Sequence, residues 1–282
     1  MTILVFGATG QVGRVLAQQP GVHALDRGQA DLTEPAACAE AILAVRPGMV
    51  INAAAYTRVD AAETEEAVAQ LVNADAPGAM AQACARMAVP FVHISTDYVF
   101  DGSGDEPWRP NAPTAPLNAY GRTKQAGEAA VLSAGGIAAI LRTSWVFDLT
   151  GQNFVTTMLR LGAERDSVRV VADQVGGPTP AGALARACWR VGLHLQQTQG
   201  NGGCYHFSGT PDTSWAGFAR AILDSAGLTC AIEDILTAEF PTPAMRPRNS
   251  RLDCNDTEAV FGLQRPDWRA ALTHGLTRRK EP

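Results

Sequence analysis

Paired cysteines and clustered histidines are missing from this sequence of 282 residues. Its six cysteines stand singly, without a Cys-x-x-Cys pair, and its five histidines are equally scattered. A chain of this length can bury a full core without disulfides, so we expect the cysteines to be reduced. No spacing typical of metal ligands occurs, and we therefore expect no metal site.

Long apolar runs and an excess of basic charge are missing as well. The first apolar run, Ile3–Phe6, is too short for a signal peptide or a membrane span, which predicts a cytoplasmic protein without a membrane partner. The net charge is −5, whereas proteins that bind duplex nucleic acid through its phosphates are usually basic. We therefore expect no nucleic-acid partner, although one basic pocket for a small anion remains compatible with this charge.

Short apolar runs alternate with longer amphipathic stretches in the first half of the chain. This pattern predicts strands at 3–6, 22–25, 49–51, 91–94 and 137–141, and helices at 11–19, 34–45 and 118–132. An Ala-rich stretch, 62–87, predicts a further helix that is interrupted at Pro77. Uniformly apolar strands separated by helices indicate an α/β fold with a doubly wound, Rossmann-like parallel sheet.

The second half of the chain is less regular. Helical segments are expected at 153–164, 182–195 and 214–226, between connections rich in Gly and Pro. Residues 101–117 predict a long loop of a kind that often binds or covers a ligand, and residues 241–247 predict an ordered loop. We expect a Rossmann-like NAD(P)-binding domain over 1–148. A smaller α/β substrate-binding region over 149–282 is expected to send segments back to it.

A turn with spaced glycines, Gly7-Ala8-Thr9-Gly10-Gln11-Val12-Gly13, lies between the first predicted strand and the first predicted helix. Glycines at this spacing allow a tight turn, a close approach of a pyrophosphate to the backbone, and packing of the helix on the strand. A structural turn alone would also explain them. The position after the first strand favours a dinucleotide site, and the candidate cofactor-binding residues here are Gly7, Thr9, Gly10, Gln11 and Val12.

The ends of the second and third strands add further cofactor candidates. Asp26 lies near the offset expected for an acid that binds the adenosine ribose, whereas Arg27 beside it suits a 2′-phosphate. The sequence therefore permits NADPH or NADH. The remaining candidates are Asp31 and Leu32, near the expected adenine, and the small residues Ala53, Ala54 and Ala55 followed by Tyr56.

A tyrosine and a lysine four residues apart, Tyr120 and Lys124, fall on one face of the predicted helix 118–132. A nearby cation favours the ionised phenol, so Lys124 together with a nicotinamide cation is expected to lower the pKa of Tyr120. In isolation such a pair is also common on surfaces. Thr96, which follows the fourth strand at the carboxyl edge of the sheet, is placed to bind a substrate carbonyl.

With these motifs in this order, the chain resembles the extended, nucleotide-sugar-modifying branch of the short-chain dehydrogenase/reductase superfamily. Further segments are similar to those of the dTDP-4-dehydrorhamnose reductase family: Asn52–Thr57, Val59-Asp60 with Glu63, Ser95–Gly102, Tyr120–Lys124 with Gly127-Glu128, Arg142–Val146, Asp173-Gln174 with Gly177–Thr179, Arg246-Pro247, and Asn249–Leu252. The resemblance covers nearly the whole chain. It implies NAD(P)H-dependent reduction of the 4-keto group of dTDP-4-dehydro-6-deoxy-L-mannose to dTDP-L-rhamnose.

The resemblance also implies roles for individual residues. Tyr120 would be the general acid/base, and Thr96 would polarise the carbonyl. Tyr120 and Lys124 also belong to the expected cofactor-binding set, with Lys124 at the nicotinamide ribose. From their charge, Arg246, Arg248 and Arg251 are candidates to meet the diphosphate of an anionic substrate, and solvated surface charges are the alternative. The full set of implied substrate-binding residues is Val59, Ser95, Thr96, Tyr98, Trp145 and Arg248.

Other functions remain open at this stage. Asp97 is followed by Tyr98, where related 4,6-dehydratases use Asp followed by Glu, and this argues against a dehydratase. A 4-epimerase is less cleanly excluded, and a non-catalytic regulatory subunit would not need Tyr120 and Lys124. Some family members bridge a dimer through Mg²⁺ with an early acid in the first helix, whereas Arg14, Val15 and Leu16 offer none. We therefore expect no metal here, and a homodimer stays one option.

Overall fold

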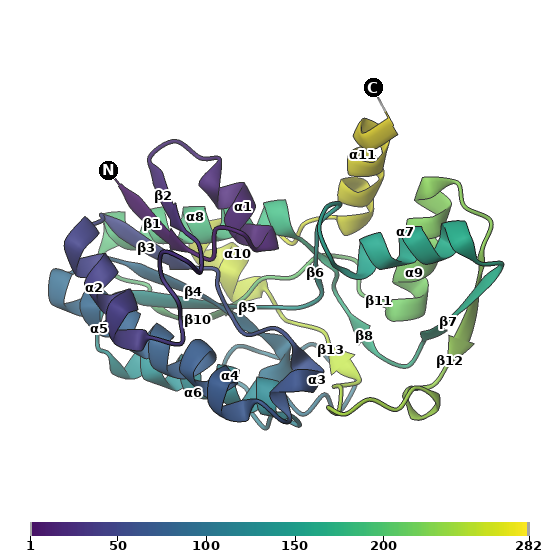
Figure 1. The fold of residues 1–282 in the computed structure, drawn as a ribbon, viewed down its shortest axis with the longest axis horizontal. Helices are drawn as coiled ribbons and strands as arrows, with labels where there is room; N and C mark the ends of the chain where they lie inside the picture. Colours follow the sequence, from purple (N-terminus) through teal and green to yellow (C-terminus); the bar gives the residue numbers. More distant parts are fainter. Residues whose placement is uncertain (1, 281–282) are drawn as a thin grey trace.

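The computed structural model describes residues 2–280, which are built around a six-stranded parallel sheet in the order β10-β5-β4-β3-β1-β2 (Figure 1). β1 and β3 are buried along their whole length, as strands covered on both faces must be. This sheet confirms the predicted doubly wound α/β class. Its strands are β1 (Ile3–Phe6), β2 (Val22–Leu25), β3 (Met49–Asn52), β4 (Phe91–Thr96), β5 (Ala138–Thr143) and β10 (Gly203–His206).

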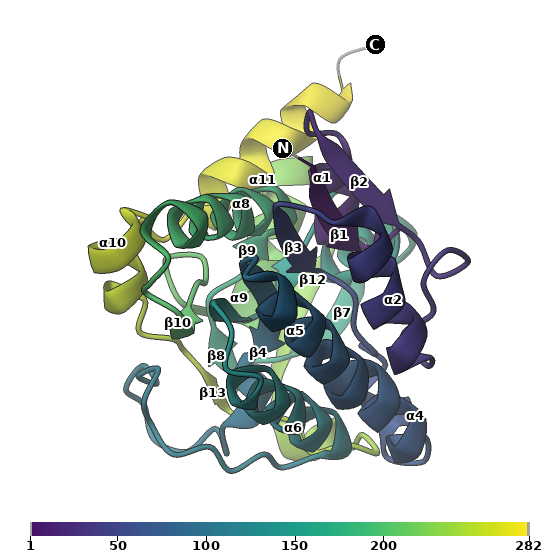
Figure 2. The same cartoon turned by 90° about the vertical axis from the view of Figure 1, so that its left-hand side faces the viewer.

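Helices cover both faces of this sheet (Figure 2). One apolar core lies between the sheet and α2 (Pro35–Val45), α5 (Ala76–Met87) and α6 (Ala119–Ser133). The other lies under α1 (Gln11–Ala17) and α8 (Ala181–Thr198), with Phe261 from α10 (Asn255–Phe261). The short helices α3 (Val59–Ala62) and α4 (Glu66–Gln70) precede α5. The second half of the chain thus returns α8 and β10 to the central sheet.

The predicted interruption of the Ala-rich helix at Pro77 is wrong. Helical structure continues from α4 through a π-helical turn, Leu71–Asp75, into α5, of which Pro77 is the second residue. A proline has no N–H to offer the carbonyl four residues earlier, that of Asn73. This carbonyl lies instead so close to Gly127 of α6 that a Cβ there would overlap it. The wide turn therefore accommodates the proline, and the break in the helix falls earlier, between α3 and α4.

Beyond β5 the chain forms a second layer with its own apolar core. Its main elements are α7 (Phe154–Glu164), α9 (Trp215–Ala226), the paired strands β7 (Ser167–Val171) and β12 (Ala231–Ile235), and α11 (Trp268–Lys280). The division of the chain near residue 148 stays a prediction. Strands of two residues, which no periodicity signals, connect the layers: β6 (Val146–Phe147), β8 (Val175–Gly176), β9 (Thr179–Pro180), β11 (Thr213–Ser214) and β13 (Asn249–Ser250).

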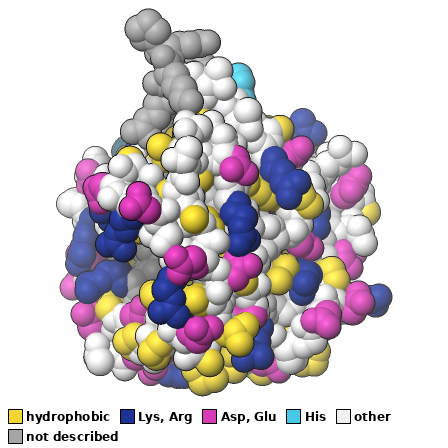
Figure 3. Space-filling model, turned by 90° about the vertical axis from the view of Figure 1, so that its right-hand side faces the viewer, with side chains coloured by type: hydrophobic (Ala, Val, Ile, Leu, Met, Phe, Trp, Pro, Cys, Tyr) yellow, Lys and Arg dark blue, Asp and Glu magenta, His cyan; other side chains and the backbone are white. Residues whose placement is uncertain are grey.

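The outer face of the second layer carries acidic and basic side chains that are interspersed (Figure 3). Pairs such as Arg160–Glu164, with N and O atoms 2.8 Å apart, and Arg220–Asp234, 2.6 Å apart, join neighbouring positions on α7, α9 and β12. This face shows no broad basic surface of the kind that binds nucleic acid. Among residues 2–280, no helix combines the length and the apolar character that crossing a membrane requires.

Candidate active site

A cavity of about 860 Å³ opens at the carboxyl ends of the central strands. Every predicted catalytic and cofactor-binding residue lines it, as do Val59, Ser95, Tyr98 and Trp145 from the predicted substrate set. Arg248 does not. This volume falls toward the upper end of the range of small-molecule and cofactor sites, about 300–1,000 Å³.

The topology explains why these residues meet. β1 pairs with β2 on one side and with β3 on the other, so the connections that leave β1 and β3 diverge to opposite halves of the sheet. The gap between them is the switch point at which doubly wound folds bind ligands. Gly7 follows β1 and Ala53 follows β3, with the Ala53 N–H donating to the carbonyl of Phe6 at 3.0 Å. Thr96 ends β4, two residues beyond the predicted strand end at 94.

The glycine turn is packed too closely for larger residues. Gly7 has φ +93°, and a Cβ on it would lie 2.8 Å from the backbone nitrogen of Ala54. A Cβ on Gly13 would overlap the carbonyl of Gly7. The resulting backbone cradle beside the start of α1 fits a pyrophosphate group.

Asp26 and Arg27, the two residues whose side chains bear on the choice between NADPH and NADH, each form hydrogen bonds within the protein. The Asp26 carboxylate accepts from the backbone N–H groups of Gly28 (2.9 Å) and Gln29 (3.1 Å). The Arg27 guanidinium donates to the Asp31 carboxylate at 3.0 Å while its side chain remains 79% exposed. Hydrogen bonds from Thr33 and Arg27 lower the pKa of Asp31. An exposed arginine held only by a surface pair can turn to a phosphate, so the geometry suits either cofactor.

Three buried side-chain atoms among the described residues lack a hydrogen-bond partner: Gln11 Oε1, Asp97 Oδ2 and Thr143 Oγ1. All three residues line the cavity. Buried polar atoms are nearly always paired in folded proteins, so unpaired atoms that share one cavity indicate that a ligand completes them. Sequence reasoning did not single out Asp97 or Thr143 as site residues, and only their positions at strand ends could have signalled them.

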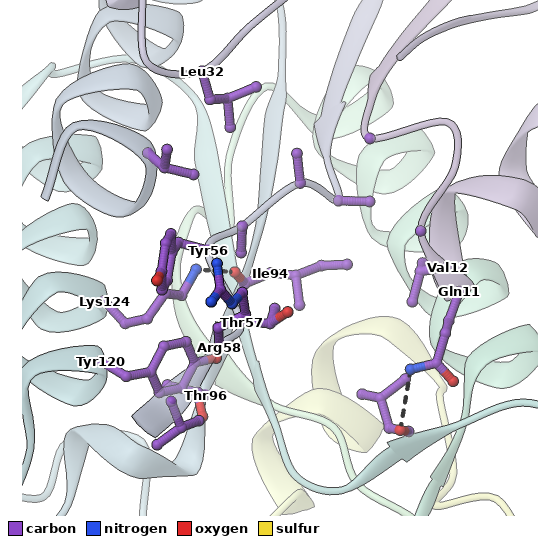
Figure 4. A pocket seen from close by; sticks show the side chains of 18 of the residues that line it. Gln11, Val12, Leu32, Tyr56, Thr57, Arg58, Ile94, Thr96, Tyr120 and Lys124 are labelled. Atoms are coloured by element: carbon purple, nitrogen blue, oxygen red, sulfur yellow. Dashed lines mark hydrogen bonds between the residues drawn. The ribbon is translucent and has the colours of Figure 1, made fainter. Parts of the chain in front are cut away.

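Tyr120 and Thr96 point toward one another in the cavity (Figure 4). Burial raises the pKa of Tyr120 to about 12, while a hydrogen bond with the Thr96 side chain acts in the opposite direction. The ring of Tyr98 meets that of Tyr120 edge-on at 5.5 Å. By itself Tyr120 is therefore a protonated phenol at neutral pH. The lowering of its pKa by Lys124 together with a nicotinamide cation stays a prediction.

Lys124 is fully buried, with a side chain that reaches from α6 to β4. Its Nζ donates to the carbonyl of Ile94 at 2.7 Å (Figure 4). It also lies 3.2 Å from Nε2 of His93. Burial lowers the pKa of Lys124 to about 8, opposed by the charge of Glu128. Sequence reasoning missed His93, because an isolated histidine within an apolar strand gives no signal of its own.

The second layer contributes an aromatic wall. Trp145, with the left-handed φ of 48°, stacks on Trp215 with ring centroids 3.8 Å apart. The indole of Trp145 also lies against Gly176, where a Cβ would meet it at 3.0 Å. A non-glycine residue held at positive φ is strained, and such strain concentrates at ligand sites. Trp215 was missed in the sequence, where it is one more aromatic at a helix start.

The remaining predicted substrate contacts are engaged elsewhere. Ser95 donates its hydroxyl to Glu128 at 2.5 Å, although the residue borders the cavity. Arg246 forms a two-pronged pair with Asp60 at 2.7 and 2.8 Å, and Arg251 bonds the side chain of Asn249. Arg248 is 69% exposed and lies 3.7 Å from Asp173. Each of the three arginines is thus held by a different partner, and their meeting at one diphosphate stays a prediction.

Comparisons with known proteins agree with this geometry. The family described as RmlD substrate binding domain matches residues 1–280. The chain is 44% identical to a dTDP-4-dehydrorhamnose reductase of Burkholderia thailandensis, covering 96% of this chain and 97% of that protein. It is 41% identical to the Salmonella typhimurium enzyme of the same name, covering 98% and 97%.

A solved structure of dTDP-4-dehydrorhamnose reductase from Bacillus anthracis, in complex with NADP, is also similar. It superimposes with a TM-score of 0.91 at 34% identity over 99% of this chain and 100% of that one. The corresponding structure from Clostridium acetobutylicum gives 0.92 at 34% identity, with the same coverage. The chain belongs to the dTDP-4-dehydrorhamnose reductase family.

Proposed function

We propose that this protein reduces the 4-keto group of dTDP-4-dehydro-6-deoxy-L-mannose with NADPH or NADH, which yields dTDP-L-rhamnose. One observation carries the proposal: a single cavity is lined both by the glycine turn and by Thr96, Tyr120 and Lys124. Family membership supports the same activity. The relatives named above are dTDP-4-dehydrorhamnose reductases, and one was solved with NADP.

The residues divide the work of the reaction. When bound, a reduced nicotinamide supplies the hydride. Tyr120, a phenol whose pKa burial raises to about 12, is protonated at neutral pH and gives its proton to the developing alkoxide at C4. Thr96, which is 5% exposed, donates a hydrogen bond to the carbonyl oxygen as charge builds on it. Burial of these groups excludes competing water from the transfer.

The cofactor is proposed to lie along the switch point, with its diphosphate on the turn that contains Gly7 and Gly10. Asp26 and Arg27 face its adenosine ribose. Because Arg27 is held only by the exposed pair with Asp31, we expect both NADPH and NADH to support turnover. A cytoplasmic location and a homodimer remain predictions, and light scattering on the purified protein tests the second.

The proposal is tested by following the absorbance of NADPH or NADH with the purified protein and dTDP-4-dehydro-6-deoxy-L-mannose. Tyr120→Phe should lower kcat by about 10²–10⁴-fold, because the proton donor is lost. Tyr205→Phe is the matched control, since the Tyr205 hydroxyl bonds the carbonyl of Asn201 and the residue does not line the cavity. Folded wild-type protein that binds NADPH and turns over neither cofactor would overturn the proposal.

A further inference from the structure

A chain of hydrogen bonds runs beneath the cavity from β3 to α6. The N–H of Ala54 donates to Oδ1 of Asn52 at 3.1 Å, and Nδ2 of Asn52 lies 3.2 Å from Nδ1 of His93. Nε2 of His93 lies 3.2 Å from Nζ of Lys124. Asn52 and His93 are completely buried and Lys124 is 1% exposed, so water cannot replace any of these partners.

The first link fixes the direction of the others. A backbone N–H only donates, so the Asn52 atom that faces Ala54 must be the oxygen and the atom that faces His93 must be the NH₂ group. Nδ1 of His93 must then accept, which leaves the ring proton of the neutral imidazole on Nε2. This N–H points at Lys124.

An N–H that points at Lys124 can be satisfied only by a lone pair. A neutral amine has one, and it can still donate an N–H to the carbonyl of Ile94. An ammonium has none, so it would face the ring N–H donor to donor. Every link of the chain is therefore satisfied when Lys124 is a neutral amine, and one link is broken when it is an ammonium.

We propose that Asn52 and His93 are positioning residues that hold Lys124 and stabilise its neutral amine, the form left when the ammonium releases a proton. In the reductase reaction, on which this role rests, the O–H bond of Tyr120 breaks and its proton goes to the C4 alkoxide. An N–H bond of the Lys124 ammonium then breaks, and its proton returns to the phenolate by way of the cavity that both side chains line. The neutral amine accepts the N–H of His93 until, after the product has left, a proton from solvent reaches it through the cavity.

The charges around Lys124 are compatible with this role. On α6, Glu128 favours the ammonium, but this carboxylate is already paired with Arg142 of β5 at 2.6 Å. On β4, burial and the charge of Lys124 hold the pKa of His93 well below its ordinary value, so His93 is a neutral ring. Tyr120 is an uncharged phenol. Burial lowers the pKa of Lys124 to about 8. The hydrogen bonds from Asn52 through His93 favour the neutral amine and therefore act on this pKa in the same direction.

The first test is the tautomer of His93, measured by ¹⁵N NMR of histidine-labelled, ligand-free protein and assigned with His93→Gln. His93 should carry its proton on Nε2. His206 is a control in the same spectrum: its Nδ1 faces the carbonyl of Trp108 at 3.0 Å and its Nε2 faces Arg142, so its proton should be on Nδ1. A His93 proton on Nδ1 overturns the proposal.

The second test is the titration of Lys124. Lysine occurs at only two positions in the sequence, 124 and 280, so ¹³Cε-lysine labelling gives a simple spectrum that Lys124→Arg assigns. In Asn52→Asp, the carboxylate can accept a proton that His93 carries on Nδ1. Nε2 of His93 is then free to accept a hydrogen bond from the Lys124 ammonium. His93→Gln provides a carbonyl oxygen for the same purpose without adding charge. Both should raise the Lys124 midpoint by about one pH unit or more, whereas Ile51→Val, an apolar neighbour on β3, should leave it unchanged.

If the Lys124 midpoint rises in Asn52→Asp but not in His93→Gln, the added charge sets the midpoint and the hydrogen bonds do not. This result would overturn the proposal. So would an unchanged midpoint in both variants. In the reductase assay, His93→Gln should shift the alkaline limb of kcat to higher pH with the NADPH KM nearly unchanged. Neither NMR measurement needs turnover, so both remain valid tests if the proposed substrate is wrong. A failure of the proposed function can therefore be distinguished from a failure of the proposed role of Asn52 and His93.

Discussion

Asp97, beside Thr96, is a buried acid with one oxygen that has no partner in the protein. Burial raises its pKa to about 7, with hydrogen bonds from Ser250 and Thr96 opposing the rise. A carboxyl whose folded pKa is raised contributes stability that is complete below its unfolded pKa near 4 and is lost as the pH rises through about 7. An asparagine at position 97 does not titrate, so the Asp97→Asn variant does not lose this stability as the pH rises.

We therefore expect Asp97→Asn to raise the Tm of the ligand-free protein relative to wild type at pH 8, and by much less at pH 4. The measurement is the difference in Tm between the two proteins by differential scanning calorimetry across this range. Asp101→Asn is the control, because Asp101 lies near the surface and a backbone hydrogen bond from Ser103 lowers its pKa instead. A difference for Asp97→Asn that stays constant with pH would contradict the assignment.

Residues with local signals could be predicted from the sequence, and residues without them could not. Gly7, Asp26, Tyr120 and Lys124 belong to motifs whose chemistry depends on short spacings, and all of them line the cavity. His93 has no comparable signal, because its role follows from the register of β3 against β4, which sets it beside Asn52.

At the scale of elements, α6 is fastened to β5 by a buried ion pair. The Glu128 carboxylate binds the Arg142 guanidinium at 2.6 and 2.8 Å, with each side chain 6% exposed. Arg142 also donates to the carbonyl of Pro110, which fixes the long loop between β4 and α6. The pair therefore ties the helix that carries Tyr120 to the sheet and to this loop.

Removing one partner should be costly because it leaves the other charge buried and unpaired. Glu128→Ala should lower the free energy of unfolding by about 3–5 kcal/mol in urea denaturation. The double variant Glu128→Leu/Arg142→Met should be less destabilised than either single change. Glu164→Ala, which breaks the exposed pair with Arg160, should change stability by no more than about 1 kcal/mol. Equal effects at Glu128 and Glu164 would refute the role of the buried pair.

Five of the six strands of the central sheet could be predicted, because each contains a short and mostly apolar run. The sixth, β10, was not predicted, since Gly203 and His206 leave it without such a run. The two-residue strands and the path through Pro77 could not be predicted either, since both depend on contacts with distant parts of the chain. The carbonyl of Asn73 lies against Gly127, more than fifty positions away, and this contact is invisible to helix propensity.

At the scale of the whole molecule, the cavity joins two layers, so a ligand that fills it should stabilise both. NADPH at a free concentration of one hundred times its Kd should raise the free energy of unfolding by about 2.7 kcal/mol. Tyr120→Phe should show the same gain, because the phenol oxygen serves the reaction and not the binding of the diphosphate. Thermal melts with and without NADPH test this. A gain that disappears in Tyr120→Phe would mean that Tyr120 holds the cofactor instead.

The substrate side of the cavity was the part least predictable from the sequence. Trp215 stacks on Trp145, although the two residues are separated in the sequence by elements of the second layer. Arg246 pairs with Asp60, which lies 186 positions earlier in the sequence. Such pairings are set by how the layers pack, which spacing along the chain does not encode. The candidate cofactor-binding residues lie just after consecutive strands, and for this reason their place in the cavity was predictable.

The central claim is that hydride passes from the cofactor to C4 of the sugar within this cavity. The most direct measurement uses NADPH deuterated at the transferred position of its nicotinamide, with the deuterium located in the product by NMR. We predict one deuterium per product molecule, at C4 of the sugar. Deuterium at another carbon, or product without deuterium, would contradict the claim.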